Sequence, residues 1–357
     1  MAFKAKVKKT VLLIVKIGVA AGLIAWLVGS GKLEPAKIWH AVRDHPFWLA
    51  AVFVLYNGCI LLTANRWRML VVSQGIPAQR SDCLRMTYIG CFFSCFLPGG
   101  TGGDLAKAYY VARDTHKKAE AVTTVFLDRV LGLYCMIGFA SVAMLFHLKD
   151  MWRHLSPPGA FGFTQTQFLA VGVLSAFAIV TVGLVVFLSS HCRRLVHYVL
   201  DRLPPRVGGV LKRVYEAVYL YRGRKLLLLK FVLYSVGAHG GAAVAFCLIG
   251  RSLGEPLAMD LSRAPNYLFL IPLGLVLNGL PVAPAGVGVF EWALAFLFAT
   301  VLGSGEANLG AEVAALSHVI IILTNQTGLF FYLAGKRKVA EAMREAQAAE
   351  PAPDPNV

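Results

Sequence analysis

The sequence contains little charge, and acidic residues are especially scarce. Asp and Glu together number 19 in a chain of 357 residues, against 35 Lys and Arg. Charged residues make up 15% of the chain and hydrophobic residues 57%, and both values lie outside the range of soluble globular proteins. The composition therefore excludes an ordinary water-soluble enzyme or binding domain and predicts an all-α integral membrane protein.

Motifs that would indicate metal, disulfide or nucleotide chemistry are also missing. The chain has seven Cys, of which Cys91 and Cys95 form the only close pair, and no His follows them at ligand spacing. We therefore expect buried, unpaired thiols and no metal site. The segment "GGTGG" is not followed by the G-K-[ST] of a phosphate loop, and no D-x-D pair occurs. No cofactor and no catalytic residue is predicted.

Long apolar runs are what the sequence has in abundance. Six runs approach or exceed the roughly 20 residues that a spanning helix needs. They cover 10–28, 47–63, 121–147, 165–189, 226–249 and 310–334. The first run lacks an A-x-A cleavage site, so we interpret it as a retained anchor.

The basic residues are distributed unevenly between the ends of these runs. If the N-terminus is cytoplasmic, 25 of the 35 Lys and Arg fall in cytoplasmic segments and seven in outside segments. This is the positive-inside bias, and it predicts cytoplasmic N- and C-termini in a multi-pass protein. The net charge of +16 then sets the topology and contacts anionic lipid headgroups, and no nucleic-acid partner is expected.

Two further apolar stretches are broken by Gly and Pro. The stretch 84–98, "LRMTYIGCFFSCFLP", has basic residues on both sides, so it predicts a hairpin that enters from the cytoplasm and turns at "GGTGG". The stretch 266–300 contains "LPVAPAGVG" and predicts a hairpin that enters from outside. Irregular backbone at membrane depth must be buried in protein or line a wet cavity, so both hairpins should face the interior.

Three spans and one hairpin in each half predict an inverted repeat. The halves are 10–150 and 165–335 of a single transmembrane domain, 1–335, followed by a short cytoplasmic tail, 336–357. Inverted repeats with broken helices that meet near the midplane are typical of secondary transporters.

Three motifs in this order resemble a known family. They are "FFSCFLPGGTGGDLAKAYYV", "AVTTVFLDRVLGL" and "LPVAPAGVGVFEWAL". The chain resembles the lysylphosphatidylglycerol synthase transmembrane-region family, the flippase-like membrane half of bacterial multiple peptide resistance factors, over about residues 10–335. The resemblance implies movement of lipids between the leaflets of a bacterial inner membrane. Only a short segment follows Gly335, so the synthase activity of the soluble domain is not implied.

The first broken stretch ends in an acid and a base. Asp104 follows Gly102 and Gly103 and is predicted to cap the next helix. The same helix start, with Lys107 one turn further on, would also suit a lipid phosphate. The two roles are compatible.

Two charged residues lie inside the third span. Asp128 shares a small, polar helix face with Thr124 and Gly132, and this face should point into the bundle. Asp128 either forms a structural ion pair, with Lys107 or with Arg129 of a neighbour, or contacts substrate. Arg129 is the better phosphate ligand, because its guanidinium can bind a phosphate with two hydrogen bonds.

The second broken stretch carries Glu291, after Gly286 and Gly288. Glu291 is either a buried carboxylate bonded to the hairpin backbone or a proton-coupling group. His239 and His318 are expected to be core residues rather than ligands.

The substrate-binding residues predicted from the sequence are therefore Gly102, Gly103, Asp104, Lys107, Asp128, Arg129, Gly286, Gly288 and Glu291. The predicted function is a flippase-like transporter of an anionic phospholipid or lipid-linked sugar. The alternatives are a membrane-embedded transferase that uses an acidic residue as general base, and a non-transporting partner of a glycosyltransferase. The sequence is also compatible with a homo-oligomer.

Overall fold

The computed structural model describes residues 22, 24–31, 33–95, 101–113, 115–153, 164–187, 189–202, 205–254, 264–279 and 286–335. Regular structure within these ranges is helical. The α-helices are α2 (Pro35–Asp44), α3 (Pro46–Ser73), α4 (Arg80–Ser94), α5 (Thr101–Arg113), α6 (Lys118–Arg153), α7 (Gln165–Phe187), α8 (Ser190–Leu200), α9 (Pro205–Leu220), α10 (Lys225–Ser252), α11 (Ala264–Asn278), α12 (Val289–Leu302) and α13 (Ala307–Asn325). The all-α prediction is confirmed.

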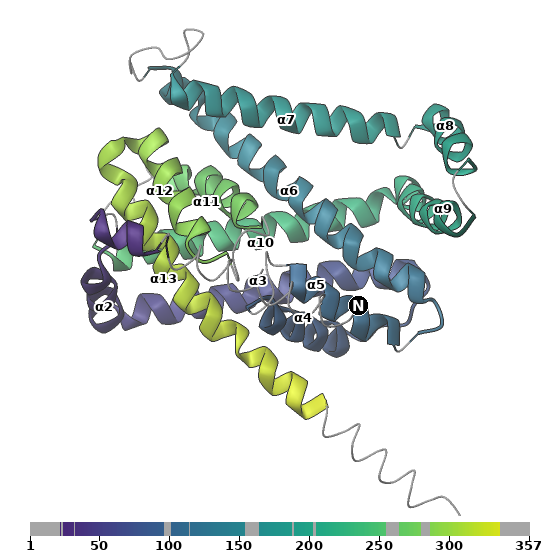
Figure 1. The fold of residues 1–357 in the computed structure, drawn as a ribbon, viewed down its shortest axis with the longest axis horizontal. Helices are drawn as coiled ribbons and strands as arrows, with labels where there is room; N and C mark the ends of the chain where they lie inside the picture. The colour runs from purple at the N-terminus through teal and green to yellow at the C-terminus, as the bar shows by residue number, and fades with distance from the viewer. Residues whose placement is uncertain are drawn as a thin grey trace, which may run out of the picture.

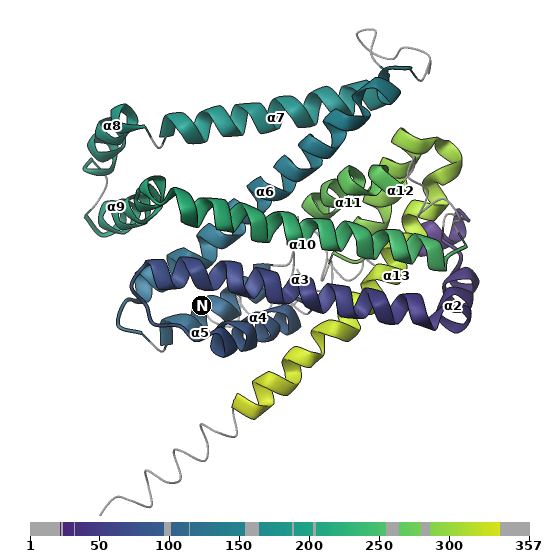
Figure 2. The ribbon, with the colours of Figure 1, turned by 180° about the vertical axis from the view of Figure 1, so that it is seen from behind.

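Five helices are long and apolar enough to cross a membrane. They are Pro46–Ser73, Lys118–Phe146, Gln165–Phe187, Lys225–Ser252 and Ser304–Gly335. These match five of the six predicted runs. Most of the first run, 10–28, lies outside the described residues. Helices α3 and α10 pack along each other through the centre of the molecule (Figures 1 and 2).

Helix α3 extends well beyond the apolar run that predicted it. The run ends at residue 63, and the sequence predicts that the span extends past Asn65. The helix continues to Ser73 and includes Arg66, which is only 6% exposed. Arg66, counted above with the cytoplasmic charges, thus lies within a helix long enough to span a membrane. A buried arginine can continue a spanning helix where the bundle supplies an acidic partner.

Each broken stretch forms a pair of short helices. Helices α4 and α5 pack against each other, and so do α11 and α12. The 15, 13, 15 and 14 residues of these helices correspond to about 20 Å each at 1.5 Å per residue, less than the roughly 30 Å hydrocarbon core. The two pairs lie toward opposite ends of the molecule (Figure 2). Their connecting residues, 96–100 and 280–285, lie outside the described residues.

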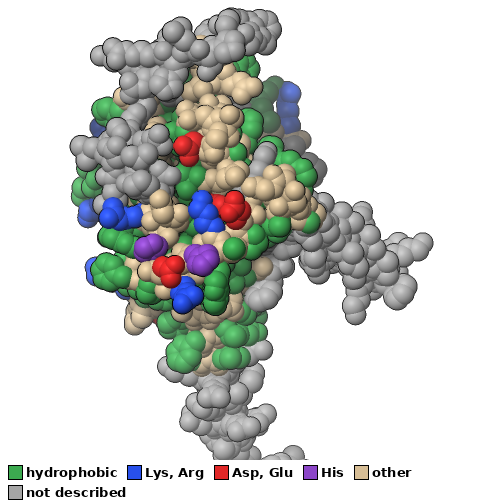
Figure 3. All heavy atoms as spheres, turned by 90° about the vertical axis from the view of Figure 1, so that its left-hand side faces the viewer, with side chains coloured by type: hydrophobic (Ala, Val, Ile, Leu, Met, Phe, Trp, Pro, Cys, Tyr) green, Lys and Arg blue, Asp and Glu red, His purple; other side chains and the backbone are tan. Residues whose placement is uncertain are grey.

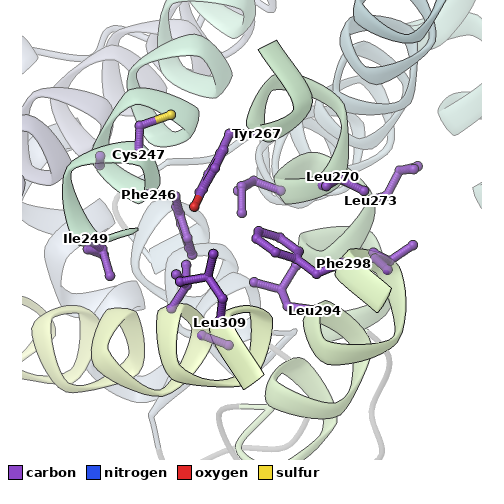
Figure 4. Close-up of a cluster of buried hydrophobic side chains, with 14 of the residues drawn as sticks. Phe246, Cys247, Ile249, Tyr267, Leu270, Leu273, Leu294, Phe298 and Leu309 are labelled. Carbon is purple, nitrogen blue, oxygen red and sulfur yellow. The ribbon is translucent and has the colours of Figure 1, made fainter. Parts of the chain in front are cut away.

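The largest hydrophobic cluster surrounds the second helix pair. Figure 4 shows side chains of α10, α11, α12 and α13 that pack together, including Phe246, Leu270, Leu294 and Leu309. The Tyr267 and Phe298 rings meet edge to face with centroids 5.4 Å apart. This dry cluster fixes the second helix pair against α10 and α13.

Helix α7 lies along one flank and exposes much of its apolar surface (Figure 1). The basic segment that follows forms α8 and α9, which lie between α7 and α10 in the chain. Glu216 joins them, because it accepts hydrogen bonds from Arg193 at 3.0 Å and pairs with His197 at 2.6 Å. Burial alone would raise the pKa of Glu216, but the bonds from His197 and Arg193 outweigh burial and lower it.

The opposite end of the molecule carries the short helix α2. Figure 3 looks onto this end, where basic, acidic and His side chains gather among hydrophobic ones. Lys37 of α2 pairs with Glu312 of α13 at 2.7 Å, and the Glu312 side chain is fully buried. This ion pair fixes α2 across the end of the bundle.

Candidate functional site

A cavity of about 400 Å³ lies at the centre of the helix bundle. Both helix pairs contribute to its wall at the ends nearest their connecting segments, with Cys95 and Asp104 from the first pair and Asn278 and Gly279 from the second. The long helices α3, α6, α10 and α13 supply the rest of the wall. The predicted meeting of the two broken stretches around an interior cavity is thus observed for the described residues.

A buried ion pair closes one side of this cavity. Arg66 Nε of α3 donates to Asp128 Oδ1 of α6 at 2.9 Å, and Arg66 Nη1 donates to Ser235 Oγ of α10 at 3.1 Å. Gly132, one turn after Asp128, leaves room for the guanidinium, because an added Cβ there would lie 2.8 Å from Arg66 Nη2. The small face predicted on this span therefore accommodates an arginine from α3.

Lys107 of α5 joins the same cluster. Its Nζ lies 3.9 Å from Asp128 Oδ2 and 4.3 Å from the centroid of the Trp67 ring, a cation–π distance. Lys107 is buried and is not part of the cavity wall. The sequence left open a pair between Asp128 and Lys107, and the structure brings these two residues together.

Arg129 pairs with the first helix pair instead of with Asp128. Its Nε lies 3.8 Å from Asp104 Oδ2, and the two side chains remain 36% and 29% exposed. Helix α5 begins at Thr101, so Asp104 lies in its first turn and not at the predicted N-cap position. The negative charge of Asp104 still stabilises α5, because it lies at the positive end of the helix dipole.

The glycine before Asp104 brings α5 against α4. An added Cβ at Gly103 would overlap the carbonyl oxygen of Gly90 and Oγ of Ser94. Gly103 thus has a packing role, which fixes where Asp104 points. Gly102 precedes it in the first turn of α5.

The second helix pair holds its acid by the backbone. Glu291 Oε2 accepts a hydrogen bond from the Gly288 N–H at 2.7 Å, so the bond to hairpin backbone expected from the sequence is present. Glu291 Oε1 pairs with His318 Nδ1 of α13 at 2.7 Å. His318, not Glu291, lines the cavity.

Gly286 fixes the turn that leads into α12. Its φ of +77° is in the left-handed region that favours glycine. An added Cβ would also overlap Oδ1 of Asn278, at the end of α11. This close contact holds the two ends of the second broken stretch together beside the cavity.

Three of the predicted charged residues line the cavity, namely Asp104, Asp128 and Arg129. No functional role is predicted from the sequence for Arg66 or His318, which also line the cavity. A signal for His318 does exist. His318, Ile322 and Asn325 recur at intervals of four and three residues, which places them on one helix face.

The described residues include no group of three or more His, Cys, Asp or Glu positioned to hold a metal ion. Comparison with curated proteins and with solved structures gives no match. A family model described as lysylphosphatidylglycerol synthase TM region matches residues 13–325, which is most of the chain and includes both helix pairs and the cavity between them. The chain therefore belongs to the lysylphosphatidylglycerol synthase transmembrane-region family.

Proposed function

We propose that this protein moves an anionic phospholipid, or a lipid-linked sugar with a phosphate, between the leaflets of the bacterial inner membrane. Membership of a family named for a lipid synthase's membrane region links the chain to membrane lipids. The proposal that the protein transports lipid is more specific than this link to lipids, and the cavity between the two helix pairs supports it.

The position and the weak pairing of Arg129 are the main observation that supports the proposal. Its guanidinium lies in the cavity wall, and its Nε is 3.8 Å from Asp104 Oδ2, longer than a hydrogen bond. Gly279 lies beside it, because an added Cβ at Gly279 would be 3.5 Å from Arg129 Nη2. A loosely held guanidinium between the two helix pairs can bind two phosphate oxygens at once.

The size of the cavity suits a headgroup and not a whole lipid. A volume of about 400 Å³ lies near the lower end of the range for small-molecule pockets. Acyl chains would remain in the bilayer while the phosphate passes between the helix pairs. We further propose that the two halves form an inverted repeat, so that each helix pair opens toward one leaflet.

Transport in vesicles tests this proposal. The purified protein is reconstituted with phosphatidylglycerol that carries a headgroup label in one leaflet, and accessibility of the label is followed with time. We expect the sidedness to change while mass spectrometry finds the lipid unaltered. Unchanged sidedness in vesicles that contain folded protein would contradict the proposal.

The alternative is a membrane-embedded transferase. Asp104 is the acid best placed for a general base, because it is partly exposed in the cavity wall. Asp128 and Glu291 are both engaged by partners at 2.9 Å or less. A new lipid species formed in the presence of a donor substrate would favour the transferase.

A further inference from the structure

His318 is a buried side chain in the cavity wall with one nitrogen unaccounted for. Its Nδ1 pairs with Glu291 Oε1 at 2.7 Å, and the residue is 5% exposed. Its Nε2 has no hydrogen-bond partner in the part of the chain that the structure describes. Buried polar atoms in native proteins nearly always have a hydrogen-bond partner, so this nitrogen is free to bond a water, an ion or a ligand in the cavity.

Glu291 determines which nitrogen can gain a proton. An ionised carboxylate only accepts hydrogen bonds, and Glu291 already accepts one from Gly288 N–H at 2.7 Å. When Glu291 is ionised, its bond to His318 has the hydrogen on Nδ1. The lone pair of the neutral imidazole is then on Nε2, and the carboxylate would stabilise the imidazolium formed when Nε2 takes a proton.

The charges around the cavity balance without that proton. The cations in and behind the wall are Arg66, Lys107 and Arg129, and the anions are Asp104, Asp128 and Glu291. A phosphate that enters beside Arg129 would leave one negative charge uncompensated in a low-dielectric interior. A proton on His318 restores the balance.

We propose that His318 Nε2 is a proton-binding site that becomes charged when a phosphate anion occupies the cavity. The proton comes from water as the anion enters, forms the N–H bond at Nε2, and returns to water when the anion leaves. The anion and one proton then occupy the cavity together, so lipid movement is linked to protons. This inference rests on the proposed function, which supplies the anion.

Other titratable groups also line the cavity. The charged ones are Arg66 on α3, Asp104 on α5, and Asp128 and Arg129 on α6, and the neutral ones are Tyr56 on α3, Cys95 after α4 and His239 on α10. Among the histidines, His239 is the nearest rival, since its Nε2 also lacks a partner among the described residues. Among the described residues, no carboxylate pairs with His239 as Glu291 pairs with His318. A charged His239 would thus lack the acid that stabilises a charged His318.

Proton uptake on binding tests the inference without requiring transport. The full-length protein in phosphatidylcholine nanodiscs receives short-chain phosphatidylglycerol in weak buffer with a pH indicator. The phosphodiester has no proton to exchange near neutral pH, so any uptake belongs to the protein. We expect about one proton per bound lipid somewhere between about pH 5 and 8. His318→Gln should abolish the uptake, and the matched control His239→Gln should retain it.

The outcomes separate this inference from the proposed function. Lipid that binds without proton uptake, or uptake that survives in His318→Gln, overturns the role of His318 and leaves the lipid site standing. Lipid that does not bind at all overturns the proposed function itself. In a second arm, sulfate replaces the lipid, and uptake with sulfate but not with lipid would assign the site to free anions.

If His318→Gln does not fold, the pH dependence of lipid binding to the wild-type protein still tests the inference. Linkage requires that the affinity for phosphatidylglycerol tighten as the pH falls, by up to about tenfold per pH unit where one proton is taken up. An affinity that does not change with pH overturns the inference.

Discussion

At the scale of single residues, the cavity contains two ion pairs with different roles. Arg66 and Asp128 are 7% and 10% exposed and meet at 2.9 Å, whereas Arg129 and Asp104 are about a third exposed and meet at 3.8 Å. A buried pair that loses one partner leaves an uncompensated charge. A partly exposed, long pair contributes about 0–1 kcal/mol. We therefore assign stability to the first pair and substrate contact to the second.

The first prediction concerns the buried pair. Arg66→Met should destabilise the folded protein by about 3–5 kcal/mol, because Asp128 loses its closest cation. The double variant Arg66→Met with Asp128→Leu should recover part of that loss, since it removes both charges of the pair but leaves the buried Lys107 without its acid. Thermal unfolding of the detergent-purified proteins measures both changes. A double variant no more stable than Arg66→Met alone would contradict the assignment.

The second prediction concerns Arg129. Arg129→Lys keeps the charge but loses the two-pronged geometry, so lipid transport should fall by about tenfold or more while the protein stays folded. The matched double variant is Arg129→Gln with Asp104→Asn, which neutralises the pair seen in the structure. A merely structural pair would be rescued by this double change. Recovery of transport in the double variant would show that Arg129 does not bind phosphate.

The sequence predicted three charged residues of the cavity, but not the closest ion-pair partner of each. Asp128 and Arg129 stand out in an apolar run, and both line the cavity. The sequence alone does not show which residues pair with them. Asp128 pairs with Arg66, 62 positions earlier in the chain, and Arg129 pairs with Asp104, 25 positions earlier. The apolar run itself ends at residue 63, and although the span is expected to pass Asn65, its end at Ser73 cannot be read from hydropathy. Helix length depends on tertiary partners that a hydropathy window does not contain.

At the level of helices, the Gly and Pro residues of the two broken stretches predicted the two short helix pairs, but they did not predict where α5 begins. Gly103 was expected in the turn, but it lies inside α5 and packs against Gly90 and Ser94 of α4. A glycine that permits close packing and one that permits a turn look the same in sequence. Gly286, with a φ of +77°, is a glycine that permits a turn.

A groove between α3 and α10 gives an element-scale prediction. It has a volume of about 730 Å³ and is lined by Arg68, Arg224, Lys225 and Lys230 together with apolar side chains. Arg68 and Arg224 donate to backbone carbonyls, whereas Lys225 and Lys230 are exposed. Anionic headgroups should bind there, and each lysine should contribute about 1 kcal/mol, or roughly fivefold in affinity.

Native mass spectrometry with added phosphatidylglycerol measures this contribution. Lys225→Gln and Lys230→Gln should each reduce the number of retained anionic lipids. Lys212→Gln is the matched control, because Lys212 on α9 already pairs with Asp201 at 3.2 Å. Equal retention in all three variants would exclude the groove as a headgroup site.

At the scale of the whole molecule, the arrangement of helices carries a prediction about sidedness. Helices α6 and α10 begin at the end of the molecule that carries α8 and α9, and α6 ends near α12 at the other end (Figure 1). The basic residues predict that the first of these ends is cytoplasmic. The two views agree that α4 and α5 lie toward that end and α11 and α12 toward the other (Figures 1 and 2).

Reporter fusions test this sidedness and, with it, the inverted repeat. Fusions after Lys118 and Lys225 should report a cytoplasmic position, and fusions after Asp150 and Gly305 an outside position. Gly305 is the decisive site, because it follows α12 directly. Helices α11 and α12 are about 22 Å and 21 Å long at 1.5 Å per residue, so neither can cross alone, and as a hairpin they are expected to return to the side from which they entered. A cytoplasmic signal at Gly305 would mean that this pair crosses the membrane as one element, and the two halves could then not be inverted copies.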